Sequence, residues 1–442
     1  MFSKNDLFRL IFPLVIEQIL AATIGIADTV MVSGVGEAAV SGVSLVDSIN
    51  LLLINVFAAL ATGGAIIVAQ YLGRKDVENA NTAAKQLLLV TTVLSTLLMG
   101  SCLIGQHGIL NLLFGSAEAD VMEQALAYFA ISALSYPFIS VYNACAALFR
   151  AQGNSKISMA ASFVMNVTNI LGNTILIFGF RLGVVGAGIS SLLSRLFGAV
   201  FLLVLLHKEN NQVSVRNLRH WEIQPWMIKS ILRIGIPNGL ENGIFQIGKI
   251  IMQGLTASFG TAAIAANAMG NSIMVITTIP GQAIGLAMVT VVGHCVGAGK
   301  YKQAKRYTLL LTGIAYASVS AITLGIFIFL NPLVSAFGLS ELAASTARQL
   351  CIVAGLGNFI FWPASFTLPN GLRAASDVRF TMLISVFSMW VFRVALSYLV
   401  GGYFGLGVVG IWICMVVDWI FRSIMFVWRL FSNKWIHRKL LA

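Results

Sequence analysis

Long apolar stretches recur along the whole chain and leave few alternatives for its fold. About 20 apolar residues in a helix span the roughly 30 Å of hydrocarbon in a bilayer. Lipid offers the backbone no partners, so each span is a helix or a strand of a closed barrel, and these stretches lack barrel alternation. We predict an all-α polytopic membrane protein of twelve transmembrane helices. The predicted spans are Leu7–Val32, Val46–Tyr71, Leu87–Gly105, Met122–Leu148, Met159–Phe178, Val184–Leu206, Ile228–Phe259, Ser272–Val296, Tyr307–Leu330, Leu350–Pro369, Phe380–Val400 and Val408–Phe431.

The composition agrees with this class of protein. Of 442 residues, 58% are hydrophobic and 10% are charged, whereas a soluble chain carries about 25% charged residues. The five cysteines have neither the pairing nor the spacing of a disulfide or metal framework, and we interpret them as small core residues. The chain also lacks a nucleotide-binding motif and paired catalytic acids, so we expect neither an enzyme nor a resident cofactor.

The net charge of +12 is distributed in a pattern typical of membrane topology. The termini and every second loop hold 22 of the 28 Lys and Arg residues, whereas the other six loops contain only Arg181 and Arg348. Cytoplasmic loops carry such an excess, so we predict both termini in the cytoplasm and a multi-pass protein of the cytoplasmic (inner) membrane. This distribution argues against a basic surface for nucleic acid. The remaining four lie within spans: Arg195, Lys249, Arg393 and Arg422.

The two halves of the chain resemble each other. At an offset of 224 residues, Pro13 aligns with Pro237 and Glu17 with Glu241. Near the end of each half, at an offset of 223 residues, Arg150 aligns with Arg373. An offset of six helices gives both halves the same orientation, so a pseudo-twofold axis along the membrane normal relates them. We predict six-helix lobes at residues 1–206 and 228–442, joined by a polar cytoplasmic linker at 207–227.

Several short motifs resemble the multidrug and toxic compound extrusion (MATE) family over essentially the whole chain. They are Ala27–Val32, Leu148–Gly153, Gly235–Pro237 and Gly371–Asp377, in the order and duplication typical of that family. The resemblance implies two six-helix lobes and cation-coupled antiport of organic cations, with no cofactor beyond H⁺ or Na⁺. It also implies that the substrates are small organic molecules and that membrane lipids surround the protein. Two complementary lobes make a monomer sufficient for transport.

Asp28 is the first candidate for the coupling ion. An ionisable residue inside the bilayer is costly, by about 2.5–3.5 kcal/mol or more, and is usually functional. Its apolar surroundings allow the carboxylate to take up and release a proton or a cation. The alternative is that Asp28 faces water at the outer end of its helix. In MATE proteins of this type, the matching acid is the cation-coupling residue.

The fifth span adds Asn169 and Asn173, which lie one helical turn apart. Such a pair commonly bridges helices through hydrogen bonds. The family pattern implies that both belong to the coupling site, with Na⁺ on Asp28, Asn169 and Asn173, and that Ser191 adds a hydroxyl. This chain has Asn173 where the family usually has Asp, so the site has one charge fewer.

Glu17, Glu241 and Asp377 are further candidates for cation coupling. The two glutamates each follow a helix proline by four residues, and each can instead bond within its own lobe. Asp377 matches an acid of the family, or pairs in a loop with the flanking Arg373 or Arg379. One MATE subclass has an essential acid where this chain has Phe245.

The seventh span carries a polar stripe that lipid would not tolerate. We predict substrate contacts for its Gln246, Lys249 and Gln253, and for Tyr136, Trp362 and Met288 as aromatic or adaptable apolar surfaces. We also predict an ion pair between Asp418 and Arg422, which lie four residues apart.

A second hypothesis places the chain among lipid-linked precursor flippases of the same superfamily. Lys249, Arg195 and Arg393 could then bind a diphosphate head group. The sequence leaves open the physiological substrate, the choice between H⁺ and Na⁺, and the lobe that holds the coupling site.

Overall fold

The computed structural model describes residues 2–115, 117–208, 211–215 and 222–436, and helices are the only regular secondary structure of this part of the chain. Residues 209–210 and 216–221 of the predicted linker lie outside it. Nine helices of the described chain are long and apolar enough to cross a membrane, and two bent helix pairs make eleven if each pair is one span. The predicted span Ile228–Phe259 corresponds to α8 (Pro225–Ala257). The predicted all-α fold is confirmed.

The chain divides into two compact units, Met1–Gly239 and Leu240–Ala442. The division lies within α8, because the first half of this helix packs on α2 (Glu37–Gly73). The side-chain nitrogen of Asn238 donates to the carbonyl of Ala59 at 3.1 Å. A Cβ on Gly63 would lie 2.7 Å from the Gly235 nitrogen, so only glycine permits this approach.

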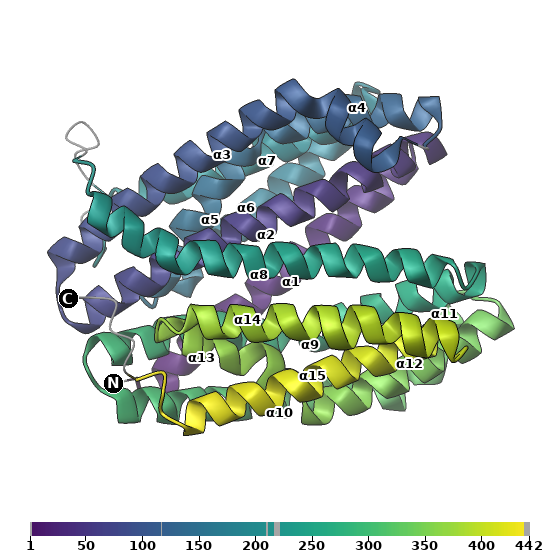
Figure 1. Cartoon of the computed structure of the whole chain (residues 1–442). Coiled ribbons are helices and arrows are strands. Elements are labelled where there is room, and N and C mark those ends of the chain that lie inside the picture. The colour runs from purple at the N-terminus through teal and green to yellow at the C-terminus, as the bar shows by residue number, and fades with distance from the viewer. Residues whose placement is uncertain (1, 116, 209–210, 216–221, 437–442) are drawn as a thin grey trace. The chain divides into compact units, whose positions relative to one another are not determined.

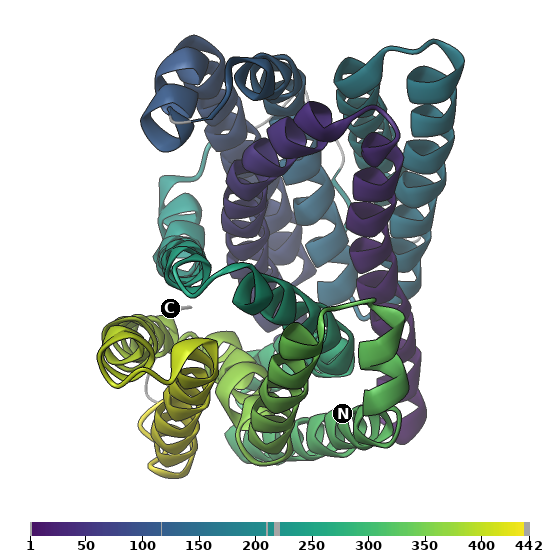
Figure 2. The same cartoon turned by 90° about the vertical axis from the view of Figure 1, so that its right-hand side faces the viewer.

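The first unit is a bundle in which α1 packs on α6, α6 on α7 and α2 on α5. Its long helices lie side by side, as Figures 1 and 2 show in purple and blue. The elements are α1 (Lys4–Ser33), α2, α3 (Val77–Phe114), α4 (Ala119–Leu134), α5 (Tyr136–Ala151), α6 (Ser155–Asn173), the π-helical segment η1 (Thr174–Gly179) and α7 (Gly183–Leu206).

The second unit repeats this order, and its core contains Trp412 and Trp419 among buried aliphatic side chains. The helix α9 packs on α10, α12 and α13, while α12 also packs on α15. After α8 come α9 (Thr261–Gly297), α10 (Tyr301–Ile328), α11 (Leu330–Ala336), α12 (Glu341–Ile360), η2 (Pro363–Thr367), α13 (Leu368–Ala374), α14 (Val378–Ser388), η3 (Met389–Ala395), η4 (Tyr398–Tyr403) and α15 (Gly407–Phe431).

The fourth span of each unit is bent where the sequence suggested one continuous helix. The bend is 46° between α4 and α5, and 64° between α12 and Pro363–Ala374. Pro137 and Pro363 follow the two breaks. Proline has no N–H for the preceding turn, so the helix is interrupted at both places.

Glycines at equivalent positions begin the second helix of each unit. Gly36 precedes α2 with φ of 141°, and Gly260 precedes α9 with φ of 96°. Residues with a Cβ rarely adopt this conformation, so both turns depend on glycine.

Candidate functional site

A carboxylate, two amides and a hydroxyl from three helices meet inside the first unit. The side-chain nitrogen of Asn173 on α6 donates to Asp28 Oδ1 on α1 at 2.6 Å and lies 3.4 Å from Asn169 Oδ1. The side-chain nitrogen of Asn169 donates in turn to Ser191 Oγ on α7 at 3.3 Å. The structure therefore brings together the four predicted residues Asp28, Asn169, Asn173 and Ser191, which we call the Asp28 cluster.

Close packing of α6 on α7 positions this cluster. A Cβ on Gly172 would lie 2.5 Å from Ser190 Oγ, so the glycine lets the two helices approach. Ser190 Oγ also donates to the backbone carbonyl of Asn169 at 2.7 Å. Asn169 is 1% exposed and Asn173 is 0% exposed, so their amides are fixed in the interior.

The Asp28 cluster offers several oxygen atoms to a hard cation. None of the ion pairs among the described residues involves Asp28. Asn173 Oδ1 is buried and accepts no hydrogen bond from the described chain. Carboxylate, amide and hydroxyl oxygens are the ligands of hard cations. The arrangement can therefore bind a proton on Asp28 or a small cation between Asp28 and Asn173.

A second polar network of the first unit was not predicted from the sequence. Asp47 Oδ1 on α2 accepts hydrogen bonds from Asn50 at 3.1 Å and Tyr128 at 3.3 Å. Asn50 Oδ1 accepts from Ser132 at 2.8 Å and Tyr136 at 2.9 Å. Asp47 lies just inside the predicted span Val46–Tyr71, and an acid inside a membrane span is the signal that could have identified this network. The predicted substrate residue Tyr136 is 0% exposed and belongs to this network.

The candidates Glu17 and Glu241 form equivalent ion pairs, one in each unit. Arg150 Nη1 lies 2.7 Å from Glu17 Oε1, and Arg373 Nη2 lies 2.5 Å from Glu241 Oε1. Both arginines come from the helix after the bend of the fourth span. These contacts favour the structural alternative, in which each glutamate bonds within its own lobe.

Asp377 is also paired, but with a partner far along the chain. Arg429 on α15 donates from Nε to Asp377 Oδ2 at 2.6 Å and from Nη2 to Oδ1 at 3.2 Å. Asp377 is 0% exposed, so it is not a solvated loop acid. Arg429 is a partner of Asp377 that the sequence did not suggest.

The predicted pair of Asp418 with Arg422 is not among the ion pairs of the described residues. Asp418 Oδ2 lies 4.0 Å from Arg393 Nη1, and Arg422 Nη2 lies 3.9 Å from Glu241 Oε1. Ser388 donates to Asp418 Oδ1. Helical spacing alone suggested the pair, whereas residues of η3 and α8 lie nearer to each partner.

The remaining substrate candidates differ in accessibility. On α8, Gln246 is partly exposed, and Lys249 and Gln253 are exposed. Trp362 is 5% exposed and stacks on Phe366 with ring centroids 5.2 Å apart. Met288 is 0% exposed. Trp362 and Met288 thus lie in packed surroundings here.

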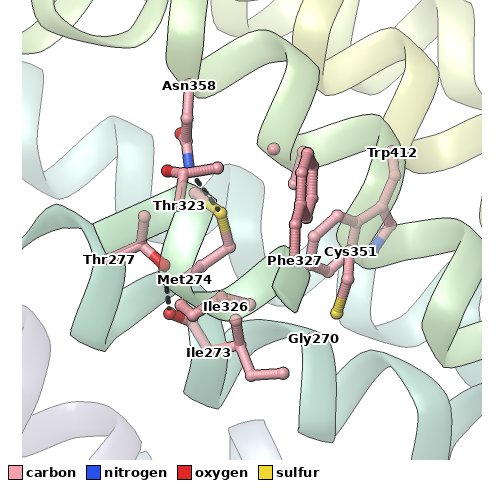
Figure 3. Close-up of a pocket in the computed structure, with 12 residues that line it drawn as sticks. Gly270, Ile273, Met274, Thr277, Thr323, Ile326, Phe327, Cys351, Asn358 and Trp412 are labelled. Carbon is pink, nitrogen blue, oxygen red and sulfur yellow. Dashed lines mark hydrogen bonds between the residues drawn. The ribbon is translucent and has the colours of Figure 1, made fainter. Parts of the chain in front are cut away.

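A small cavity of about 10 Å³ lies among α9, α10, α12 and α15. Figure 3 shows Phe327, Cys351 and Trp412 on one side of it, and Met274 and Asn358 on the other. It has room for about one water molecule. None of the predicted site residues lines it.

Comparisons with known proteins cover both units. A family model described as MatE matches residues 13–175 and 237–399, two segments that are 224 residues apart like the internal repeat. The chain is 27% identical to the "Uncharacterized transporter YisQ" of Bacillus subtilis, with 98% of this chain and 95% of the relative covered. It is 26% identical to the "Probable multidrug resistance protein NorM" of Thermotoga maritima, with 99% and 94% covered.

Solved structures share the fold. One is a transporter of the MOP superfamily from Pyrococcus furiosus, which is described as having a binding pocket of reverse polarity that suggests a different function. It matches with a TM-score of 0.91 and 21% identity, and the match covers 99% of this chain and 97% of that chain. A crystal structure of MATE in complex with MaL6 matches with a TM-score of 0.90, 22% identity, and 98% and 97% covered.

Proposed function

Because the chain belongs to the MatE family and is therefore a multi-pass membrane transporter and not an enzyme, we propose that it is a cation-coupled antiporter that exports small organic molecules. Several relatives are named as probable multidrug resistance proteins, which supports drug efflux. The sequence-based proposal that the substrates are organic cations stays a prediction. We further propose that the protein works as a monomer in the cytoplasmic membrane, with both termini in the cytoplasm.

The Asp28 cluster carries the proposal of ion coupling. Asp28 lies in a membrane span and accepts a hydrogen bond from a neutral amide. A bound proton or Na⁺ neutralises the carboxylate and thereby removes the cost of a charge in the membrane. An ion that binds one conformation more tightly than another shifts the population between them. Energy stored in the ion gradient can thus drive alternating access.

The test is gradient-driven transport by the purified protein in liposomes. An imposed pH or Na⁺ gradient should drive accumulation of the organic cation ethidium by the wild type, and Asp28→Asn should abolish it. The ion whose gradient works identifies the coupling. Asp120→Asn is the matched control, because it makes the same change at an exposed acid near the start of α4.

Ion binding supplies a readout that needs no substrate. A ligand that binds the folded state raises the thermal stability of the protein. Na⁺ or low pH should therefore raise the Tm of the wild type relative to choline, and this response should be absent in Asp28→Asn. An Asp28→Asn variant that keeps both the ion response and gradient-driven transport would refute coupling at this cluster.

A further inference from the structure

Three cationic side chains surround one aromatic ring in the second unit. Lys249 Nζ lies 5.8 Å from the centroid of the Phe245 ring, Arg393 Cζ lies 5.5 Å from it and Arg422 Cζ lies 5.7 Å from it. They come from α8, η3 and α15, so the folded unit assembles them from distant parts of the sequence. We call Lys249, Arg393 and Arg422 the basic cluster.

Acidic groups do not balance this cluster. Arg393 lies 4.0 Å from Asp418, and Arg422 lies 3.9 Å from Glu241. Glu241 is also paired with Arg373 at 2.5 Å. Two acids therefore face four cations, and Lys249 takes part in none of the ion pairs of the described residues. The excess of two positive charges favours an anion.

The guanidinium groups also have unused donors. Nε and Nη1 of Arg422 and Nε of Arg393 are buried, and they donate no hydrogen bond to the described chain. Arg422 is only 3% exposed. A buried polar group without a partner costs free energy. An oxygen-bearing anion would satisfy these donors, because guanidinium geometry suits carboxylate and phosphate oxygens.

Lys249 gives the cluster an accessible side. Its side chain is exposed and lies within the predicted span Ile228–Phe259. A lysine that faced lipid at this depth would be costly, so the exposed ammonium group is expected to face a water-filled space. Arg393, whose side chain is 12% exposed, lies beside the same Phe245 ring.

Aromatic rings form the apolar border of the cluster. Phe245 packs edge-on against Phe366 with ring centroids 6.2 Å apart, and Arg422 Cζ lies 4.4 Å from the Phe366 centroid. A suitable ligand therefore combines an acidic group with an apolar part. A free inorganic anion would make no apolar contact with these rings.

We propose that the basic cluster binds the acidic group, a phosphate or a carboxylate, of an amphipathic organic substrate whose apolar part contacts Phe245 and Phe366. The interpretation of the basic cluster as a substrate site rests on the transport function proposed above. It extends the expected substrates from organic cations to amphipathic molecules that carry a negative group.

Equilibrium binding of dansyl-undecanoic acid to the full chain in phosphatidylcholine nanodiscs tests the proposal. Lys249→Gln and Arg393→Gln should each weaken binding about tenfold, as expected for one lost hydrogen bond to a charged group. Lys249→Arg should retain binding. Lys302→Gln is the matched control, because it removes an exposed lysine from α10 in the same unit. Unchanged Tm values establish that the variants are folded.

Competitors distinguish the sources of the acidic group. Displacement by octyl phosphate added from solution supports a soluble substrate, whereas displacement only when phosphatidic acid is built into the nanodisc supports a lipid head group. Three outcomes would overturn the proposal. They are equal displacement by ethidium, displacement by inorganic phosphate but not by either amphiphile, and unchanged affinity in both glutamine variants.

The binding measurement uses no ion gradient, so the outcome is separate from that of the coupling test. Asp28→Asn should bind dansyl-undecanoic acid as the wild type does. Anion binding that survives in Asp28→Asn and is lost in Lys249→Gln supports this site even if coupling at Asp28 fails.

Discussion

Glu17 lies in a membrane span, is 6% exposed, and has partners for both carboxylate oxygens. Arg150 lies 2.7 Å from Oε1, and Ser158 donates to Oε2 at 2.6 Å. Glu17 thus has a cationic partner, whereas the hydrogen bond to Asp28 comes from the neutral amide of Asn173. We therefore expect different roles for the two acids, although both lie on α1.

Glu17→Gln should destabilise the protein without removing ion coupling. The substitution removes the carboxylate that pairs with the half-buried Arg150. Removal of one partner of a buried pair costs up to about 3–5 kcal/mol. We expect a lower Tm in thermal unfolding in detergent, while gradient-driven transport per folded molecule stays near that of the wild type.

Glu123→Gln provides the matched control, since Glu123 is exposed on α4 and outside the described ion pairs. Its Tm should equal that of the wild type. A Glu17→Gln protein of normal Tm that no longer responds to the gradient would instead assign coupling to Glu17.

Helical spacing and the family resemblance together suggested which residues gather at Asp28. Asn169 and Asn173 lie one turn apart, so they share a face of α6, and the family pattern placed that face near Asp28. Partners from distant helices could not be predicted in this way. The contact of Arg429 with Asp377 depends on how α15 packs beside the start of α14, which no local pattern records.

At the level of elements, hydropathy predicted all twelve spans but not their breaks. A window average over Met122–Leu148 is apolar throughout, so the bend between α4 and α5 leaves no signal in it. Pro137 was visible in the sequence, but proline is tolerated in membrane helices and does not by itself require a break.

Gly63→Ala should destabilise the contact between α2 and the first half of α8. The new Cβ would lie 2.7 Å from the nitrogen and 2.8 Å from the Cα of Gly235, and backbone atoms cannot move aside as a side chain can. Overpacking typically costs about 1–3 kcal/mol. Thermal unfolding should therefore give a lower Tm.

Gly100→Ala is the control in the same unit, because a Cβ at Gly100 of α3 meets nothing within 4 Å. There the higher helix propensity of alanine should leave the Tm unchanged or raise it. Equal Tm values for both variants would show that α2 and α8 do not need this close approach.

For the whole molecule, the distribution of Lys and Arg predicts which loops face the cytoplasm. Single cysteines at Lys302 and Glu341 should lie on opposite sides of the membrane. A membrane-impermeant maleimide added to intact cells should label Glu341→Cys, and it should label Lys302→Cys only after the membrane is opened.

The native cysteines should give little background, because all five are free and buried. Both target residues are exposed, which makes labelling a test of sidedness and not of burial. Labelling of Lys302→Cys alone in intact cells would reverse the proposed orientation.

An equivalent ion pair occurs in both units, at positions that align in the internal repeat. In each unit it joins a glutamate of the first span to an arginine on the helix after the bend of the fourth span. Inheritance from a single ancestral half explains such a pair most simply. Around it the copies have diverged in charge, with Asp28 and Asp47 in one and the basic cluster in the other. From the two proposals we infer that the duplicated halves took on different roles, with the coupling ion bound in the first unit and the substrate in the second.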